Sequence, residues 1–400
     1  MKKLLFIVIF FGIVLKLFFF CKNNDEKAMI LRGIDFKTGV VDFKSSYIGT
    51  CFDKTEQKDI IYFVDKKSCI KRYYLTGEKK DSVPLNETID FLKNCNDVIR
   101  IVTTYSSDTI LILSKYKNYI LSVNGKGEIY RVISRDSILP DSVRGLLGID
   151  NVWSTGSNSD YNNLIYTLYP KQEYYMKYYS GIDTLGLYEQ MLLMNKFDFE
   201  LPYFINIKGL YTDSLKFNFV IEDYAYRHYE QGEFIFRFND FKVIKDKLFV
   251  LPFELDKISV YSINGFEHLE DVKITSKYTE IGQNPLTIKE YLNESDFYQT
   301  IGRVQNIFYN EEQEQFYVVV SHAFKNETEL KAMENGKFRA FSIIVYEKNF
   351  DNSREFVFEA NTYAGSRSYM TSEGLLIERK PKELTINNYG IQTFDLFNFN

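Results

Sequence analysis

One spacing of apolar and polar positions recurs three times along the chain. In each copy a run of four or five apolar residues leads into a polar turn, an apolar residue lies 10 positions after the first of the run, and a glycine follows 7 positions later. The copies span residues 60–77, 110–127 and 248–265. A short continuous apolar run is consistent with a strand buried on both faces, and glycine supplies the positive φ of a tight turn. Each copy is therefore predicted to be a β-hairpin that ends in a second turn.

Weaker copies of this unit begin near residues 164, 316 and 374, with predicted partner strands at 191–194, 341–346 and 384–386. Together they make six apolar strands, near residues 60, 110, 164, 248, 316 and 375, and we interpret these as the innermost strands of the sheets. Hairpins that recur every 40–50 residues are typical of a β-propeller. The prediction is an all-β propeller of six blades, with seven as the alternative.

Other segments are predicted to be insertions or closing strands. Residues 285–302 and 328–335 have the pattern of short helices, residues 171–186 are rich in tyrosine, and residues 214–238 add strand-like material. The chain ends in alternating apolar residues from 391 to 399. Propellers close by pairing strands from both termini, which removes an exposed edge. A strand at 29–36 or one at 45–52 is expected to pair with the C-terminal segment.

The N-terminus has the pattern of a lipoprotein signal peptide. Two lysines precede an uncharged apolar run of 12 residues, whereas a membrane-spanning helix needs about 20. Cys21 stands at the lipobox position, directly before a polar stretch, and is the expected site of lipid attachment. The alternative is an uncleaved signal anchor. The predicted organisation is a signal peptide at 1–20, a lipidated tether and first strand at 21–44, and a single propeller domain at 45–400.

Composition and motifs exclude several functions. Cleavage before Cys21 would remove Lys2, Lys3 and Lys16 and lower the net charge from −5 to −8, which argues against nucleic acid as a partner. The aromatic content of 17% suits a strand-rich fold. The chain has no phosphate-binding loop, no nucleophile elbow and no zinc-ligand spacing, so no cofactor and no metal are predicted.

The cysteines of the mature domain are Cys51, Cys69 and Cys95. Their odd number leaves at least one thiol outside any disulfide. A Cys51–Cys69 disulfide is open, and buried thiols are the favoured interpretation.

A few polar residues are candidates for a site, although no catalytic residue is assigned. His322 ends one of the predicted inner strands, near the central channel, and Arg303 precedes the same sheet. Arg227 and His228 lie in a tyrosine-rich insertion, whereas His268 follows a turn and is expected in solvent. The first hypothesis is a non-enzymatic module that binds a protein or a glycan through its inserted loops. The alternative is an envelope hydrolase or lyase with its site at the channel.

The mature chain also resembles a known family. The lipobox-like start, the hairpins at 60–77 and 248–265 and the strand pair at 303–320 carry this resemblance, which is to the Bacteroidetes lipoproteins grouped as DUF4221. The resemblance implies a propeller of the six-bladed or TolB-like type. It also implies an outer-membrane lipoprotein of the cell envelope, on the periplasmic face or the cell surface, with no known activity.

Overall fold

The computed structural model describes residues 28–38, 48–65, 69–106, 108–115, 119–134, 147–154, 163–170, 204–208, 215–218, 238–252, 256–263, 267–282, 301–324, 339–380 and 391–399, and single positions 186 and 189. Its described strands form six antiparallel sheets of four strands each. In five of them the strands follow one another in chain order. In the sixth, the outermost strand comes from the N-terminal end of the described chain.

The first three sheets account for residues 48–218. The first contains β2 (Ile48–Asp53), β3 (Lys58–Asp65), β4 (Cys69–Tyr74) and β5 (Lys79–Pro84). The second contains β6 (Ile99–Ser106), β7 (Thr109–Ser114), β8 (Tyr119–Asn124) and β9 (Ile129–Ser134). The third contains β10 (Leu147–Ser154), β11 (Asn163–Pro170), β12 (Phe204–Lys208) and β13 (Leu215–Asn218).

The remaining sheets complete the ring. The fourth contains β14 (Phe238–Ile244), β15 (Lys247–Pro252), β16 (Lys257–Ser262) and β17 (His268–Lys273). The fifth contains β18 (Arg303–Asn310), β19 (Gln315–Ser321), β20 (Phe341–Glu347) and β21 (Ser353–Phe358). The sixth contains β22 (Tyr363–Thr371), β23 (Gly374–Arg379), β24 (Ile391–Asn398) and β1 (Met29–Lys37).

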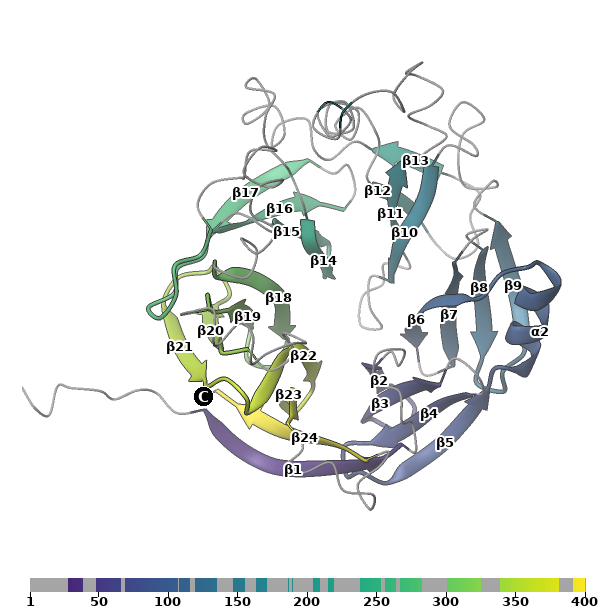
Figure 1. Ribbon diagram of the computed structural model, residues 1–400, viewed down its shortest axis with the longest axis horizontal. Coiled ribbons are helices and arrows are strands. Elements are labelled where there is room, and N and C mark those ends of the chain that lie inside the picture. The colour runs from purple at the N-terminus through teal and green to yellow at the C-terminus, as the bar shows by residue number, and fades with distance from the viewer. Residues whose placement is uncertain are drawn as a thin grey trace, which may run out of the picture.

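The sheets are arranged radially around a centre (Figure 1). The first strand of each sheet contacts the first strand of the next, in the closed series β2, β6, β10, β14, β18, β22 and back to β2. The fold is therefore an all-β propeller, which confirms this part of the predicted fold class.

The position of the apolar strands within each sheet was predicted wrongly. β3 and β19, two of the strands interpreted as innermost, are the second strands of their sheets, and β2 and β18 lie inside them. A second strand is paired along both edges and covered on both faces by neighbouring sheets, so successive positions in its middle are apolar. A first strand has one edge toward the centre, so buried and less buried side chains alternate more along it. The burial patterns show this contrast, because six of the eight residues of β3 are buried but only two of the six in β2.

Some partner strands and helices also differ from the prediction. The predicted strand at 341–346 is confirmed as β20, but β11 pairs with β12 and β23 pairs with β22 and β24. Two predicted strands, at 191–194 and 384–386, and the predicted helix at 328–335 lie outside the described residues. The structure describes only the last two residues of the predicted helix at 285–302. The one helix of the described chain, α2 (Asn86–Asn94), was missed because it is short and buries only Thr88 and Leu92. No described helix is long and apolar enough to cross a membrane.

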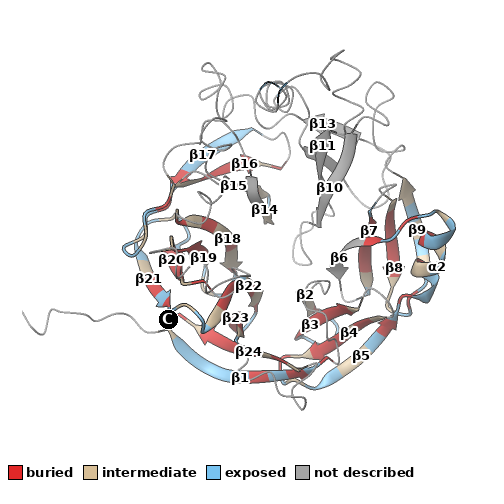
Figure 2. Cartoon of the chain, viewed as in Figure 1, coloured by how far each residue is buried: buried red, intermediate tan, exposed pale blue. Residues whose placement is uncertain are grey.

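Strands from the two ends of the described chain close the ring. β1 pairs with β24, with Phe36 opposite Gln392, which confirms the first of the two predicted closures. Phe36 is fully buried among Phe63, Tyr73 and Phe394, so that β1 joins the sixth sheet to the first (Figure 2). β1 is thus the outer strand of the sixth sheet.

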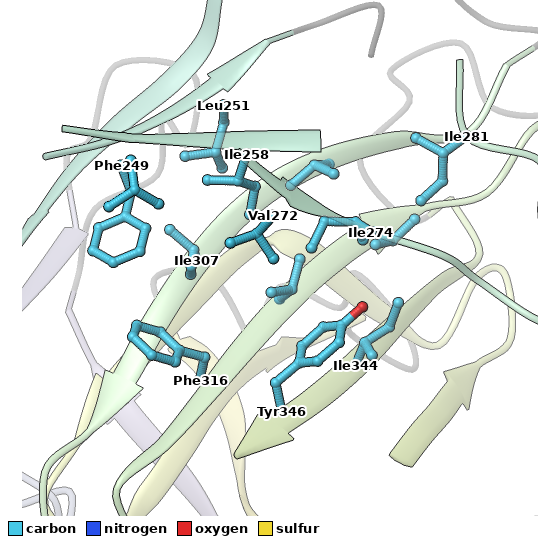
Figure 3. Packing of buried hydrophobic residues seen from close by; sticks show 14 residues of the cluster. Phe249, Leu251, Ile258, Val272, Ile274, Ile281, Ile307, Phe316, Ile344 and Tyr346 are labelled. Carbon is cyan, nitrogen blue, oxygen red and sulfur yellow. The ribbon is translucent and has the colours of Figure 1, made fainter. Parts of the chain in front are cut away.

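The seam between the fourth and fifth sheets is the part of the core that supports the site described below. Its buried cluster includes Ile258 and Ile274 from the fourth-sheet side and Val318, Val320 and Ile344 from the fifth (Figure 3). Side chains alternate along a strand, so the odd-numbered Tyr317 and Val319 of β19 instead pack against the sixth sheet. This alternation decides which way each residue at the end of β19 faces.

Candidate functional site

Long connections gather on one face of the ring. Because the four strands of each sheet alternate in direction, second strands end, third strands start and fourth strands lead into the next sheet at this face, which we call the connection face. Four connections here contain 19 to 33 residues, between β11 and β12, β13 and β14, β17 and β18, and β19 and β20. The turns at the opposite face contain at most 8 residues. Loops of a propeller that carry recognition are therefore expected on the connection face.

His322 is the centre of a polar cluster on this face. It directly follows β19, its side chain is only 9% exposed, and its Nε2 lies 2.6 Å from Oγ of Ser342. The His322 backbone N–H donates to the carbonyl of Ala340. The Arg339 guanidinium donates from Nε to the carbonyl of His322 and from Nη2 to the carbonyl of Ile301, at 2.9 Å in the second case. The cluster therefore fastens the beginning of β18 to the connection between β19 and β20.

The segment that follows β17 packs against this cluster. The ring of Tyr278 is nearly parallel to that of His322, with 6.5 Å between centroids and 11° between planes. Thr279 Oγ1 accepts a hydrogen bond from the backbone N–H of Ala323 at 3.1 Å. Gly302 donates its N–H to the carbonyl of Glu280 at 3.0 Å, and a Cβ on this glycine would lie 2.6 Å from that oxygen. Close backbone approach thus requires glycine at position 302.

A buried carboxylate shapes the turn before Tyr278. Glu355 of β21 is 7% exposed and accepts hydrogen bonds from Ser276 Oγ at 2.6 Å and from the Lys277 N–H at 2.7 Å. Ser276 Oγ in turn accepts the backbone N–H groups of Tyr278 and Thr279, at 3.1 and 3.2 Å. The turn is therefore held by its hydrogen bonds to Glu355 of the fifth sheet and by those that the Ser276 hydroxyl accepts within the turn.

This segment lines a groove of about 490 Å³, which we call the 273–281 groove. Asp256 and residues 273–281 form its walls, and most of these carry polar side chains. Tyr278 is 46% exposed, although one side of its ring faces His322. A rigid aromatic ring can stack on the apolar face of a ligand, while hydroxyl and charged groups beside it form hydrogen bonds to the polar rim of that ligand.

Arg303 begins β18 and His322 directly follows the neighbouring β19, but the two side chains face opposite sides of the fifth sheet. Arg303 is paired with Ser321, so its side chain is directed toward the sixth sheet, whereas His322, one residue further, lies against Tyr278. Burial lowers the pKa of the Arg303 guanidinium. Ser342, the hydroxyl partner of His322, has no exposed surface and is not accessible to a substrate in this conformation.

The other predicted site residues are placed less fully. Arg227 and His228 lie outside the described residues. His268 opens β17, with its Nε2 3.1 Å from Oδ1 of Asp271, on the outer strand of the fourth sheet. Cys21 also lies outside the described residues.

The described cysteines and acidic groups add no second site. Cys51, Cys69 and Cys95 form no disulfide. Within the described part of the chain, no three His, Cys, Asp or Glu residues are grouped so that they could hold a metal ion.

Sequence reasoning missed Tyr278, Thr279, Arg339 and Glu355. Glu355 bonds to Ser276 across 79 positions of the chain, and Thr279 bonds to Ala323 across 44. Such contacts form only when the fourth and fifth sheets pack together. The one local signal was the run of polar residues 275–280 around Tyr278, which follows the predicted hairpin at 248–265 after a short gap.

Comparison with solved structures agrees with the propeller fold. A DUF4221 family member from Bacteroides vulgatus ATCC 8482 superposes with a TM-score of 0.64 and 16% sequence identity, over 94% of this chain and 99% of that chain. The resemblance to this family is thereby confirmed, and at this identity it shows the fold alone.

More distant matches have TM-scores below 0.5. The β-propeller domain of Cps50 (Swd1) from Myceliophteria thermophila gives 0.42 at 8% identity, over 93% of this chain and 100% of that chain. A luciferin-regenerating enzyme gives 0.42 at 9% identity, over 92% of this chain and 95% of that chain. No family model matches the sequence, and no curated protein does.

Proposed function

We propose that the chain is a lipid-anchored cell-envelope protein whose propeller is a non-enzymatic binding module, with the 273–281 groove as its binding site. The observation that carries this proposal is that Tyr278 exposes its ring from a backbone segment that is held in place. Its ring is 46% exposed, yet the segment is held by His322, Glu355 and Gly302. Exposed aromatic groups on a fixed backbone lose little conformational entropy when a ligand binds.

A glycan is favoured over a protein as the ligand. The groove offers one exposed ring among hydroxyl and charged groups, which matches a sugar ring with its apolar face and polar edge. Protein interfaces instead tend to centre on several apolar or aromatic anchors that exclude water. The groove lies on the connection face, beside the start of β18.

Replacing Tyr278 by alanine is expected to weaken glycan binding about tenfold, which corresponds to a loss of about 1.4 kcal/mol. The reason is that alanine removes the stacking surface while the hydrogen bonds to Glu355 use the side chain of Ser276 and the backbone of Lys277. Screening the purified chain on an array of bacterial and host glycans, followed by titration of the strongest ligand, measures this effect.

Tyr130→Ala is the matched control for that experiment. Tyr130 is 45% exposed but lies on β9, the outer strand of the second sheet. We expect its removal to leave glycan affinity unchanged. A chain that binds no glycan on the array, or two variants that lose affinity equally, would contradict the groove as a glycan site.

The membrane anchor has its own prediction. Cys21→Ala should move the protein from the membrane fraction to the soluble fraction, because each acyl CH₂ buried in the bilayer contributes about 0.8 kcal/mol and the substitution removes every acyl chain. Fractionation of cells followed by immunoblotting measures the distribution. Cys95→Ala, which changes a cysteine near the end of α2, should stay with the membrane. Unchanged membrane association of Cys21→Ala would rule out lipid as the anchor.

A further inference from the structure

Three consecutive apolar side chains at the start of β1 are exposed. Met29 is 58% exposed, Ile30 51% and Leu31 41%, and we call these three residues the β1 rim (Figure 2). β1 is the outermost strand of the sixth sheet, so one of its edges is not paired within that sheet. A run of exposed apolar residues on an edge strand favours aggregation, and natural sheets avoid it unless another surface covers the residues.

The strand geometry explains why neighbouring residues are exposed together. The register of β1 against β24 shifts between Ile30 and Arg32, so Leu31 is an extra residue in a bulge. Bulges interrupt regular pairing and twist the edge, which hinders the addition of another strand there. Pairing with a strand of a partner protein is therefore a poor fit to this edge, whereas a surface that needs no backbone pairing fits well.

The start of β1 also contacts the neighbouring fifth sheet. Ala28 packs against the cluster that contains Phe356 and Phe358 of β21, which brings the start of β1 beside the fifth sheet. Figure 1 shows β1 and β21 on the outer circumference of the ring, away from the centre.

The distance to the proposed lipid determines what covers this rim. Met29 is eight residues after Cys21, and a fully extended chain of that length spans at most about 28 Å. If Cys21 carries lipid, as the proposed function holds, then the start of β1 cannot lie far from the bilayer surface. The rest of the propeller is joined to Cys21 through this strand.

We propose that the β1 rim inserts into the interfacial layer of the phospholipid bilayer to which Cys21 is attached. The inference rests on the lipidation in the proposed function and adds an orientation to it. The propeller stands with its circumference toward the membrane, so the connection face and the 273–281 groove are open to the side. Lipid acyl chains and headgroup carbons cover Met29, Ile30 and Leu31, and no backbone pairing is required.

Tryptophan placed on the rim tests this contact. The chain has one tryptophan, Trp153, so Trp153→Phe gives a background in which Ile30→Trp reports a single site. The acylated protein is reconstituted into phosphatidylcholine vesicles that contain brominated lipid, which quenches tryptophan only on close contact. Val132→Trp is the matched control, because Val132 is 43% exposed on the outer strand of the second sheet. Mass spectrometry of the N-terminal peptide establishes acylation.

We expect quenching at position 30 to exceed that at position 132 severalfold. Acylated, vesicle-bound protein with equal quenching at both positions, or none at either, would overturn the rim contact and leave the lipid anchor standing. A protein that is not acylated would overturn the anchor and, with it, this inference. Dimers in detergent that dissociate on Met29→Ser with Leu31→Ser would show that a second copy covers the rim instead.

Discussion

Replacing Phe36 by alanine is expected to lower the free energy of unfolding by about 3–5 kcal/mol, the usual cost of removing a buried phenylalanine ring. Phe36 has no exposed surface, and its ring centroid lies 5.4 Å from that of Phe63 and 5.7 Å from those of Tyr73 and Phe394. These partners belong to the first and sixth sheets, so the cavity would open at the seam that closes the ring. Total stabilities of about 5–15 kcal/mol make this a large loss. Urea denaturation followed by circular dichroism measures it.

The control for Phe36 is Tyr130→Ala, which removes an aromatic ring from an outer strand where it is 45% exposed. Surface substitutions away from special features usually change stability by about 0.5 kcal/mol or less. If the two substitutions have similar effects, then the closing strand contributes little to holding the ring together, and β1 is a peripheral addition to a propeller that is already stable.

Gly127→Ala is expected to destabilise the protein by about 2–4 kcal/mol, which combines the cost of a left-handed backbone for alanine with that of overpacking. Gly127 has φ of 88°, and a Cβ there would lie 2.2 Å from the carbonyl oxygen of Pro84, the last residue of the preceding sheet. The turn therefore needs glycine for its own conformation and for contact with its neighbour. Thermal unfolding of the purified variant measures the loss.

Gly125 lies in the same turn and gives the matched comparison. Among the described residues, the atom nearest to a Cβ on Gly125 would be Nη2 of Arg72, at 3.7 Å, which is ordinary van der Waals contact. Gly125→Ala should therefore leave the unfolding temperature nearly unchanged. Equal losses for the two alanine variants would mean that contact with Pro84 and the positive φ of Gly127 do not decide the stability of this turn.

The sequence predicted the repeated hairpin because that unit is built from local interactions. Strand, polar turn, strand and glycine follow one another within 18 residues, and Gly77 and Gly127 have the positive φ predicted for them. The position of each strand in its sheet, from innermost to outermost, was harder to predict from the sequence. Apolar content reports how many faces and edges of a strand are covered, and the most covered strand is the second, not the first.

The candidate site was only partly predictable. His322 was identified by its place at the end of an apolar strand and Arg303 by its place before the same sheet, and both lie at one end of the fifth sheet. Their side chains face different neighbours, because they occupy opposite phases of the strand alternation. Tyr278, which the structure places over His322, had no distinguishing pattern in the sequence beyond its polar surroundings.

By itself the sequence determined the all-β class, the repeating unit, closure by an N-terminal strand at either 29–36 or 45–52, and the expectation of a lipid-bearing Cys21, because periodicity, turn residues and an N-terminal signal are properties of consecutive positions. The tertiary structure alone decided which strand is innermost, that Gly127 meets Pro84, that Glu355 and His322 hold the segment of Tyr278, and that Met29, Ile30 and Leu31 are exposed together. The physical reason is that these features arise where sheets pack against one another or end at an edge, and residues far apart in the chain meet only there.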